Sequence, residues 1–294
     1  MQPKKLSIHH SRQLCDLALE AGWSFTLQQA QLFLSATDCA LGYFDQEEEL
    51  LATATLFPYS HGIATLGNVL VKEQYRRQGL GRRIVEECLA SAEDPLSSTL
   101  LIATPLGYPL YQRLGFTTVG HVLRFVLENS PAESNTVIQN TPQVFSDGNI
   151  TPLEREPGDA LNSLLVKMDE TTFGANRASV YHPLLAVIQA GRMFYNQTSQ
   201  LTGFALATKR SDLLYVGPVI AEDAGVAEAL ICSIIGSWHG PVRVDVLHHQ
   251  NQVQEKLRKL GFVQVQSSPL MVKGPLALPG QRNRYYGILD PALC

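Results

Sequence analysis

The sequence repeats part of itself at an interval of about 150 residues. The phrase Arg113-Leu114-Gly115-Phe116 recurs as Lys259-Leu260-Gly261-Phe262, 146 residues later. The apolar run Val69-Leu70-Val71 has a counterpart at Val219-Ile220, 150 residues later. Two matches in the same order indicate a duplicated fold. A chain of 294 residues is also the right length for two domains of roughly 150 residues each.

Helical and strand-like periods alternate around these matches, which predicts an α/β (α+β) chain. In the first half the pattern predicts helices at 11–22, 27–35, 79–92 and 110–114, and strands at 40–44, 50–57, 62–71, 100–103 and 116–127. In the second half it predicts helices at 160–168, 226–235 and 253–260, and strands at 201–208, 213–220, 242–247 and from 262. Ser11 and Thr26 stand where N-caps are expected.

A change in composition separates the two halves. Residues 129–149 are rich in Ser, Asn, Thr, Pro and Gln, which is typical of a linker. We therefore expect a first domain at 1–128, a linker at 129–149 and a second domain at 150–294.

The composition argues against several classes of partner. A formal net charge of -4 gives no general attraction to nucleic acid or to an anionic membrane. No run approaches the ~18 apolar residues of a membrane span. The five cysteines are scattered and form no C-x-x-C pair, which favours reduced thiols and no metal site. We expect a cytoplasmic protein, monomeric or homodimeric, without nucleic-acid or membrane binding.

One segment carries groups that suit an anion. Arg76-Arg77-Gln78-Gly79-Leu80-Gly81-Arg82 lies between a predicted buried strand and an amphipathic helix. The two glycines let the backbone approach a ligand closely. The first turn of a helix leaves N–H groups unpaired, and the helix dipole adds positive charge there. Guanidinium groups suit phosphate oxygens, so the segment predicts a phosphate site.

Other interpretations of this segment are weaker but stay open. It can be a solvated basic turn. A dinucleotide fingerprint is incomplete, since Ile84 stands where the third glycine belongs, and a Walker loop lacks its Gly-Lys-Ser/Thr. An arginine cluster can also bind nucleic acid, although no basic or aromatic stripe accompanies this one.

The segment resembles the signature of GNAT acyltransferases, R/Q-x-x-G-x-G/A, with Arg76, Gly79 and Gly81 at the defining places. The run Tyr111–Phe116 is similar to the Tyr-x-x-x-Gly-Phe that closes the family's fourth helix. The resemblance covers about 6–127 well, and 150–274 only in the order of elements. The chain resembles tandem GNAT proteins, in which an intact N-terminal copy precedes a degenerate one. Each copy is then a mixed, mostly antiparallel twisted sheet flanked by helices.

The resemblance implies an N-acetyltransferase that moves an acetyl group from acetyl-CoA to the amine of a small molecule. The amine attacks directly in a ternary complex, and CoA is the product. Tyr111 takes the place of the family's frequent general acid, which protonates the leaving thiolate; packing beside Leu114 and Phe116 is the alternative. The resemblance assigns the cofactor to Val69, Leu70, Val71, Arg76, Arg77, Gln78, Gly79, Leu80, Gly81 and Arg82.

Some positions depart from the family pattern. The predicted strand at 66–71 lacks the glutamate that often serves as base, so the general base is unassigned; Glu73 and His61 are near in sequence. Where many members have an asparagine before the tyrosine, this chain has Leu106–Pro109. A non-catalytic acyl-CoA sensor or regulatory protein is therefore the alternative function.

The second copy lacks both signatures. Glu222 and Asp223 stand where the first copy has arginines, and they would repel a pyrophosphate. Leu257 stands at the tyrosine position. We expect this copy to bind no CoA and to complete the acceptor cleft. The acidic residues of a polar patch from Met168 to Arg177 either attract an amine or belong to a solvated helix end.

Overall fold

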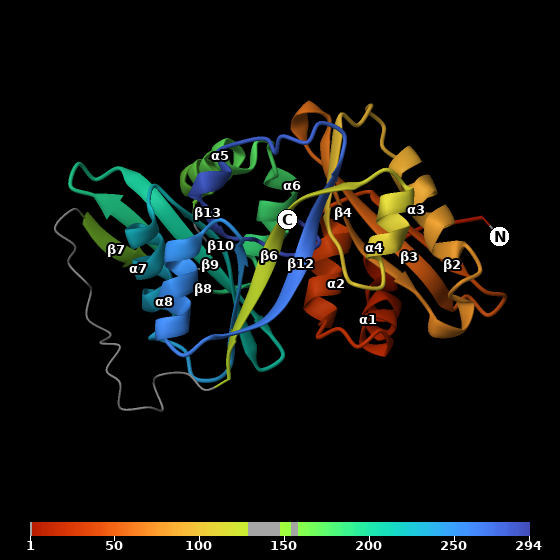
Figure 1. Cartoon of the computed structure of the whole chain (residues 1–294), viewed down its shortest axis with the longest axis horizontal. Coiled ribbons are helices and arrows are strands. Elements are labelled where there is room, and N and C mark those ends of the chain that lie inside the picture. The colour runs from red at the N-terminus through yellow and green to blue at the C-terminus, as the bar shows by residue number, and fades with distance from the viewer. Residues whose placement is uncertain (1, 129–147, 154–157) are drawn as a thin grey trace.

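The computed structural model describes residues 2–128, 148–153 and 158–294, and these form one 13-stranded sheet (Figure 1). The expected linker lies almost entirely outside the described residues. The elements of the first half are β1 (Lys4–Lys5), α1 (Ser11–Glu20), α2 (Leu27–Ser35), β2 (Cys39–Phe44), β3 (Leu50–Pro58), β4 (Ile63–Val71), α3 (Leu80–Ala90), β5 (Ser98–Ile102), α4 (Tyr108–Arg113) and β6 (Thr117–Leu127). The elements of the second half are β7 (Gly148–Pro152), α5 (Asp159–Phe173), α6 (Ala178–Leu185), β8 (Ile188–Asn196), β9 (Leu201–Arg210), β10 (Leu213–Ala221), α7 (Ala224–Ile235), β11 (Val242–Leu247), α8 (Asn251–Lys259), β12 (Val263–Lys273) and β13 (Tyr285–Gly287).

The predicted mixed fold of helices on a mostly antiparallel sheet is confirmed. The N-cap prediction for Thr26 is also confirmed, because its hydroxyl accepts from the Gln29 N–H at 3.2 Å and Gln29 bonds back to the Thr26 N–H. The prediction for Ser11 is wrong. Ser11 is the first helical residue of α1, and its hydroxyl donates to the Ile8 carbonyl at 2.6 Å. The helix α6 and the strands β1, β7, β8 and β13 were not predicted.

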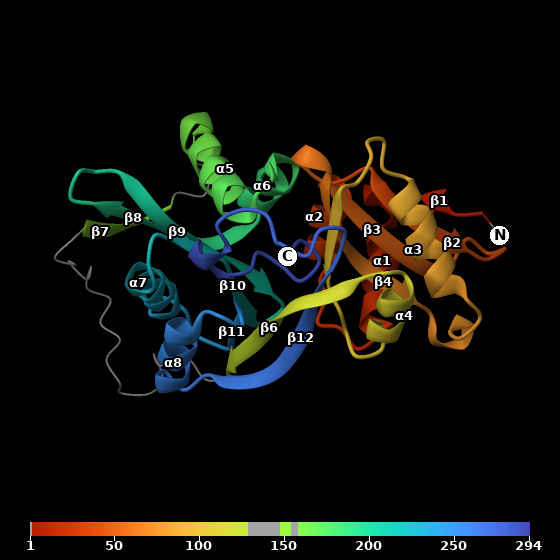
Figure 2. The same ribbon diagram turned by 45° about the horizontal axis from the view of Figure 1, so that its top comes forward.

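The two halves exchange strands at the centre of the sheet. Strand β12 of the second half lies between β5 and β6 of the first, and β6 lies between β12 and β11. Figure 2 shows β6 and β12 side by side, connecting the two ends of the molecule. Each half therefore completes its sheet with a strand of the other. This exchange was not predicted from the sequence.

Strand β4 separates from its neighbour β5 part of the way along. The two strands pair in parallel at three positions only, from Ile63↔Ser98 to Thr65↔Leu100. A bulge then interrupts the pairing of β4 with β3, and Asn68 within it has a φ of 50°. The rest of β4 keeps β3 as its strand neighbour. Among the described residues, its other edge has no strand partner beyond Thr65.

The second half repeats this arrangement but adds a further strand beside it. Strands β10 and β11 also pair in parallel at three positions, and a bulge follows in β10 between Val216 and Val219. Here β13 pairs antiparallel with β10 beyond the bulge, and the Ile288 N–H donates to the Asp245 carbonyl of β11 at 2.9 Å. In the second copy β13 thus pairs with a strand edge whose equivalent in β4 has no strand partner among the described residues.

Three hydrophobic clusters hold the sheet and helices together. One lies under α3 and α4, and another under α7 and α8. The third contains residues of α1 and α2 from the first half, of α5 and α6 from the second, and the segment after β13. This third cluster is shared by both halves. No helix among the described residues is long and apolar enough to cross a membrane.

Candidate functional site

The turn before α3 leaves the start of that helix open. Gly79 is the N-cap residue and has a left-handed φ of 82°, which glycine adopts without strain. No side chain among the described residues caps the helix. A Cβ built on Gly79 would meet nothing within 4 Å. The first amide groups of α3 thus have no side-chain cap, and the side-chain direction of Gly79 is open, as an anion site requires.

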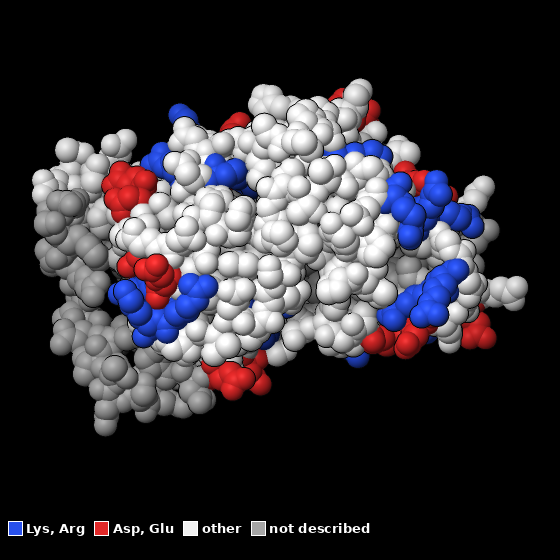
Figure 3. Space-filling view, in the orientation of Figure 1, with Lys and Arg blue, Asp and Glu red and all other residues white. Residues whose placement is uncertain are grey.

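The arginines of the turn have different roles. Arg76 donates through Nε to the Val71 carbonyl at 3.1 Å, which ties the turn to the end of β4. Arg82 pairs with Glu86 at 2.9 Å on the exposed side of α3. Arg77 is exposed and has a left-handed φ of 61°. In Figure 3 basic side chains gather on both sides of a hollow on the part of the molecule that carries α3. The local charge suits phosphate oxygens.

The turn, the unpaired end of β4 and α4 meet at one corner. A Cβ on Gly81 would lie 3.4 Å from Val71 Cγ2 and 3.6 Å from Leu110 Cδ2, so these three elements are in close contact. The structure thereby brings the predicted cofactor residues of β4 and of the turn next to the helix that carries Tyr111. These residues fit an acyl-CoA, because an uncapped helix start lies beside the part of β4 that β5 does not pair with.

Tyr111 lies in α4 and is buried. Its ring packs edge-on against Phe116, with centroids 5.9 Å apart. A Cβ on Gly107 would come within 2.8 Å of Tyr111 Cε2, so only glycine leaves the ring in this position. Burial raises the pKa of Tyr111 above its ordinary value. The phenol is therefore protonated throughout the physiological range, as a proton donor must be.

Other residues singled out from the sequence lie elsewhere. Glu73 and His61 are both exposed. The polar patch between Met168 and Arg177 is neither an amine-attracting surface nor a solvated helix end. Asp169 and Arg177 are both 0% exposed and form a bidentate ion pair, with distances of 2.6 and 2.8 Å. The sequence shows Asp169 eight residues before Arg177, but it does not show the burial that makes the pair structural.

In the second copy, the carboxylate of one aspartate lies at the helix start where the first copy would bind an anion. Asp223 is the N-cap of α7, and its carboxylate accepts from the Val226 N–H at 2.9 Å. The amide that a phosphate would need is thus already bonded. Leu257, at the tyrosine position, is fully buried.

Two models of the same family match the chain. The model described as "Acetyltransferase (GNAT) domain" matches residues 38–118, and a second model with the same description matches residues 165–287. Together these matches contain the turn at Arg76–Gly81, Tyr111 and the whole region from α6 to β12. The chain belongs to the GNAT acetyltransferases and carries two GNAT domains in tandem.

A similar curated protein spans nearly the whole chain. The "Uncharacterized N-acetyltransferase YitH" of Bacillus subtilis (strain 168) is 26% identical over 289 residues, which is 98% of this chain and 97% of that protein. The matches identify this chain as an acetyltransferase, and the family's chemistry is acyl transfer.

Solved structures share the fold. A putative acetyltransferase from Pyrococcus horikoshii has a TM-score of 0.78 and 18% identity, covering 100% of this chain and 95% of its own. A tandem GNAT protein from the clavulanic acid biosynthesis pathway has a TM-score of 0.69 and 12% identity, covering 93% of this chain and 99% of its own. The fold of this chain therefore resembles that of a solved tandem GNAT protein.

Proposed function

We propose that this protein transfers the acetyl group of acetyl-CoA to the amine of a small molecule, at one site formed by the first copy. One observation carries the proposal. The uncapped start of α3, the edge of β4 beyond its bulge and the buried Tyr111 meet at one corner of the sheet. The second copy differs at each of these places, with a capped helix start, a paired strand edge and Leu257 at the tyrosine position.

Each residue of the corner has a part in the proposed reaction. The amides of the Arg76–Gly81 turn and of the first turn of α3 hold the pyrophosphate. The backbone of Val69–Val71 bonds the pantetheine arm, and an amide there stabilises the oxyanion as the amine attacks the thioester carbon. Acetyl-CoA supplies an activated acyl group with a thiolate leaving group. Tyr111 donates its proton to the sulfur as the carbon–sulfur bond breaks.

The proton of the attacking amine has no assigned acceptor. The strand β4 offers hydroxyl and carboxamide groups here, such as Thr65 and Asn68, and no carboxylate. We propose that the amine reacts in its neutral form and gives up its proton to water. The acidic side of the pH profile then follows the pKa of the acceptor and not that of an enzyme group.

This proposal is tested by binding and by turnover measured separately. Isothermal titration with acetyl-CoA is expected to show one site per chain, because β13 and Asp223 occupy the second copy's site. Release of CoA thiol is then followed with a panel of primary amines and polyamines. Tight binding of acetyl-CoA without turnover on any amine would instead support the alternative function, a non-catalytic acyl-CoA sensor or regulatory protein.

The pH dependence provides a further check. Burial raises the pKa of Tyr111, so the phenol keeps its proton at pH 9 and well above it. We expect kcat to rise with pH as the amine loses its proton and to show no fall on the alkaline side up to at least about pH 9.5. Profiles with two amines of different pKa should shift on the acidic side only. A loss of kcat between about pH 7 and 9 would contradict the role of Tyr111.

A further inference from the structure

The bulge in β4 changes which residues of the strand bond to β3. Before the bulge the Tyr59 N–H donates to the Ile63 carbonyl at 2.7 Å, and just after β4 the Lys72 N–H donates to the Leu51 carbonyl at 2.8 Å. Every second residue of an antiparallel strand bonds to a given neighbour, so in a regular strand such residues are an even number of positions apart. Ile63 and Lys72 are nine positions apart. The bulge therefore shifts the pairing of β4 with β3 by one residue.

The side chains of β4 show the same shift. Before the bulge Ile63 packs in the cluster that contains α1 and α2, whereas Leu66 packs in the cluster under α3 and α4. After the bulge Leu70 packs in the first of these clusters, and Val69 and Val71 pack against the second. The odd-numbered residues thus change face within the strand. Without the extra residue, Val69 and Val71 would point to the opposite face of the sheet.

The shift also turns the backbone of Val69 and Val71 away from β3. Because Lys72 bonds to β3, the next residue of β4 that bonds to that strand is Leu70. The N–H and carbonyl groups of Val69 and Val71 then point to the edge that β5 does not pair with. In agreement, the Val71 carbonyl accepts from Nε of Arg76, in the turn before α3, at 3.1 Å. Val69 and Val71 are also the two residues of β4 that are only partly buried.

Asn68 forms the bulge. Together with Val69 it lies opposite one residue of β3, Ala54, and its φ is 50°. Glycine usually takes a left-handed φ at the first residue of a bulge, and asparagine adopts this φ more readily than most other residues. The Asn68 side chain is buried, and its Nδ2 lies 3.5 Å from Thr55 Oγ1 on the neighbouring strand. The local sequence thus places the extra residue at Asn68.

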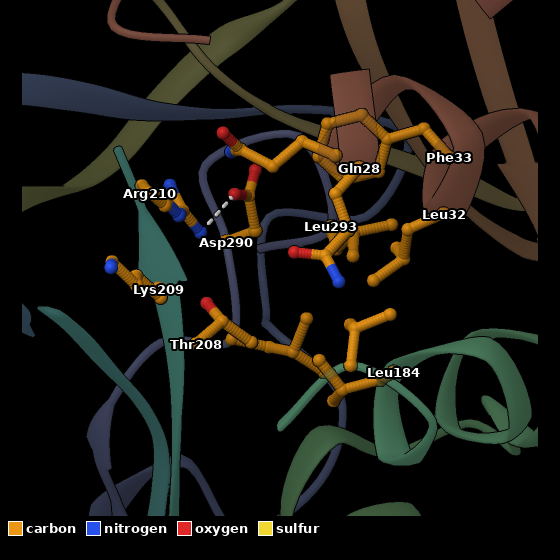
Figure 4. Close-up of a pocket in the computed structure, with 12 residues that line it drawn as sticks. Gln28, Leu32, Phe33, Leu184, Thr208, Lys209, Arg210, Asp290 and Leu293 are labelled. Atoms are coloured by element: carbon orange, nitrogen blue, oxygen red, sulfur yellow. Dashed lines mark hydrogen bonds and ion pairs between the residues drawn. The ribbon is translucent and has the colours of Figure 1, made fainter. Parts of the chain in front are cut away.

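The residue before the bulge is held in place from the second half of the chain. A Cβ on Gly67 would lie 2.7 Å from the Ala292 Cα, so the segment after β13 packs directly on this part of β4. The ion pair of Arg210 with Asp290, at 2.6 Å, fixes that segment; Figure 4 shows the pair beside a cavity next to α2. The left-handed position therefore cannot move from Asn68 to Gly67 without displacing this segment.

We propose that Asn68 is a positioning residue, whose left-handed backbone turns the Val69 and Val71 amides toward the pantetheine arm of acetyl-CoA. The inference rests on the proposed function and deepens it in two ways. It gives the amide contacts to Val69 and Val71 and not to Leu70, whose backbone bonds to β3. It also assigns the effect to the backbone conformation of Asn68 and not to its carboxamide group.

Hydrogen exchange of the wild-type protein, measured by NMR for single amides, tests the direction of these groups. In the free protein the Leu70 N–H should exchange slowly, because it bonds to β3, and those of Val69 and Val71 should exchange at least about 10-fold faster. Acetyl-CoA should slow Val69 and Val71. The nucleotide 3′-phospho-ADP should not, because it carries the pyrophosphate but no pantetheine arm. Protection of Leu70 by acetyl-CoA, with Val69 and Val71 unchanged, would overturn the inference.

Variants at position 68 test the role of the backbone. Asn68→Gly keeps the left-handed φ without a side chain, whereas a β-branched valine is strained there. Ser199→Val is the matched control, since Ser199 has a φ of 59° in an exposed turn of the second copy. Isothermal titration measures the dissociation constants of acetyl-CoA and of 3′-phospho-ADP, and release of CoA thiol with the best amine of the panel measures kcat. Thermal unfolding shows whether a variant is folded.

Asn68→Val is expected to weaken acetyl-CoA binding about 10-fold, as the loss of one or two hydrogen bonds would. Its kcat should fall about 100-fold, because the thioester is misplaced. Binding of 3′-phospho-ADP should change by less than about twofold. Asn68→Gly and Ser199→Val should stay within about threefold of the wild type in all three quantities.

Three results for the variants would overturn the inference. These are a 100-fold loss of kcat in Asn68→Gly, wild-type values in Asn68→Val, and equal weakening of both ligands in a folded Asn68→Val. If Asn68→Val does not fold, Asn68→Gly and the exchange of the wild-type amides decide. A wild-type protein that binds acetyl-CoA and acetylates no amine would overturn the proposed function, and the exchange and binding measurements, which need no turnover, would still decide what Asn68 positions.

Discussion

Replacing Tyr111 by phenylalanine is expected to lower kcat by about 10²- to 10⁴-fold, the usual contribution of a positioned general acid. The change removes the proton donor and keeps the ring, which packs against Phe116. The dissociation constant for acetyl-CoA should change by less than about twofold, since the proposed phosphate and pantetheine contacts come from other residues. Stopped-flow detection of CoA thiol and isothermal titration measure the two quantities separately.

Tyr108 provides the matched control. It is in the same helix, and its hydroxyl accepts from Gln112 at 3.2 Å and from Thr118 at 3.4 Å. Tyr108→Phe should therefore leave kcat within about threefold of the wild-type value. The reverse pattern, with Tyr108→Phe inactive and Tyr111→Phe active, would indicate that Tyr108 is the general acid. Full activity in both variants would show that neither tyrosine is the general acid.

A fragment of residues 1–128 is expected not to fold into an active protein. In the whole chain both strand neighbours of β6 belong to the second half, and β5 pairs with β12. The fragment would expose both edges of β6 and the free edge of β5, together with the apolar surface that the shared cluster buries. We expect no cooperative thermal transition in circular dichroism, no acetyl-CoA binding and aggregation at micromolar concentration.

Co-expression of 1–128 with 148–294 is the control for this experiment. If strand exchange is the cause, the two pieces should assemble and recover binding of acetyl-CoA, because β6 and β12 can then pair. A soluble fragment of residues 1–128 with wild-type turnover would show that the first copy is independent of the second.

The sequence alone predicted the features that depend on neighbouring residues. The turn at Arg76–Gly81 needs glycine at a left-handed φ and an open helix start, and both requirements are visible in a short stretch of sequence. The capping of α2 by Thr26 is equally local. The duplication was visible because equivalent elements keep equivalent residues, as in Leu114-Gly115-Phe116 and Leu260-Gly261-Phe262.

Features that depend on distant pairing could not be predicted in this way. Apolar patterns in β6 and β12 show that these are strands, but nothing in either strand shows which half it joins. Asp169 and Arg177 look like exposed charges in the sequence, and only the approach of the segment Leu289–Cys294 makes them a buried pair.

The sequence by itself thus determined the class of fold, the duplication and the residues of the proposed cofactor turn, because these follow from local conformation and composition. Only the tertiary structure decided that the two copies share one sheet, that β13 pairs with β10 in the second copy and that Ala292 covers Gly67. These features depend on backbone hydrogen bonds and van der Waals contacts between residues far apart in the chain. Many different sequences can form such contacts, so the sequence alone does not show which residues meet.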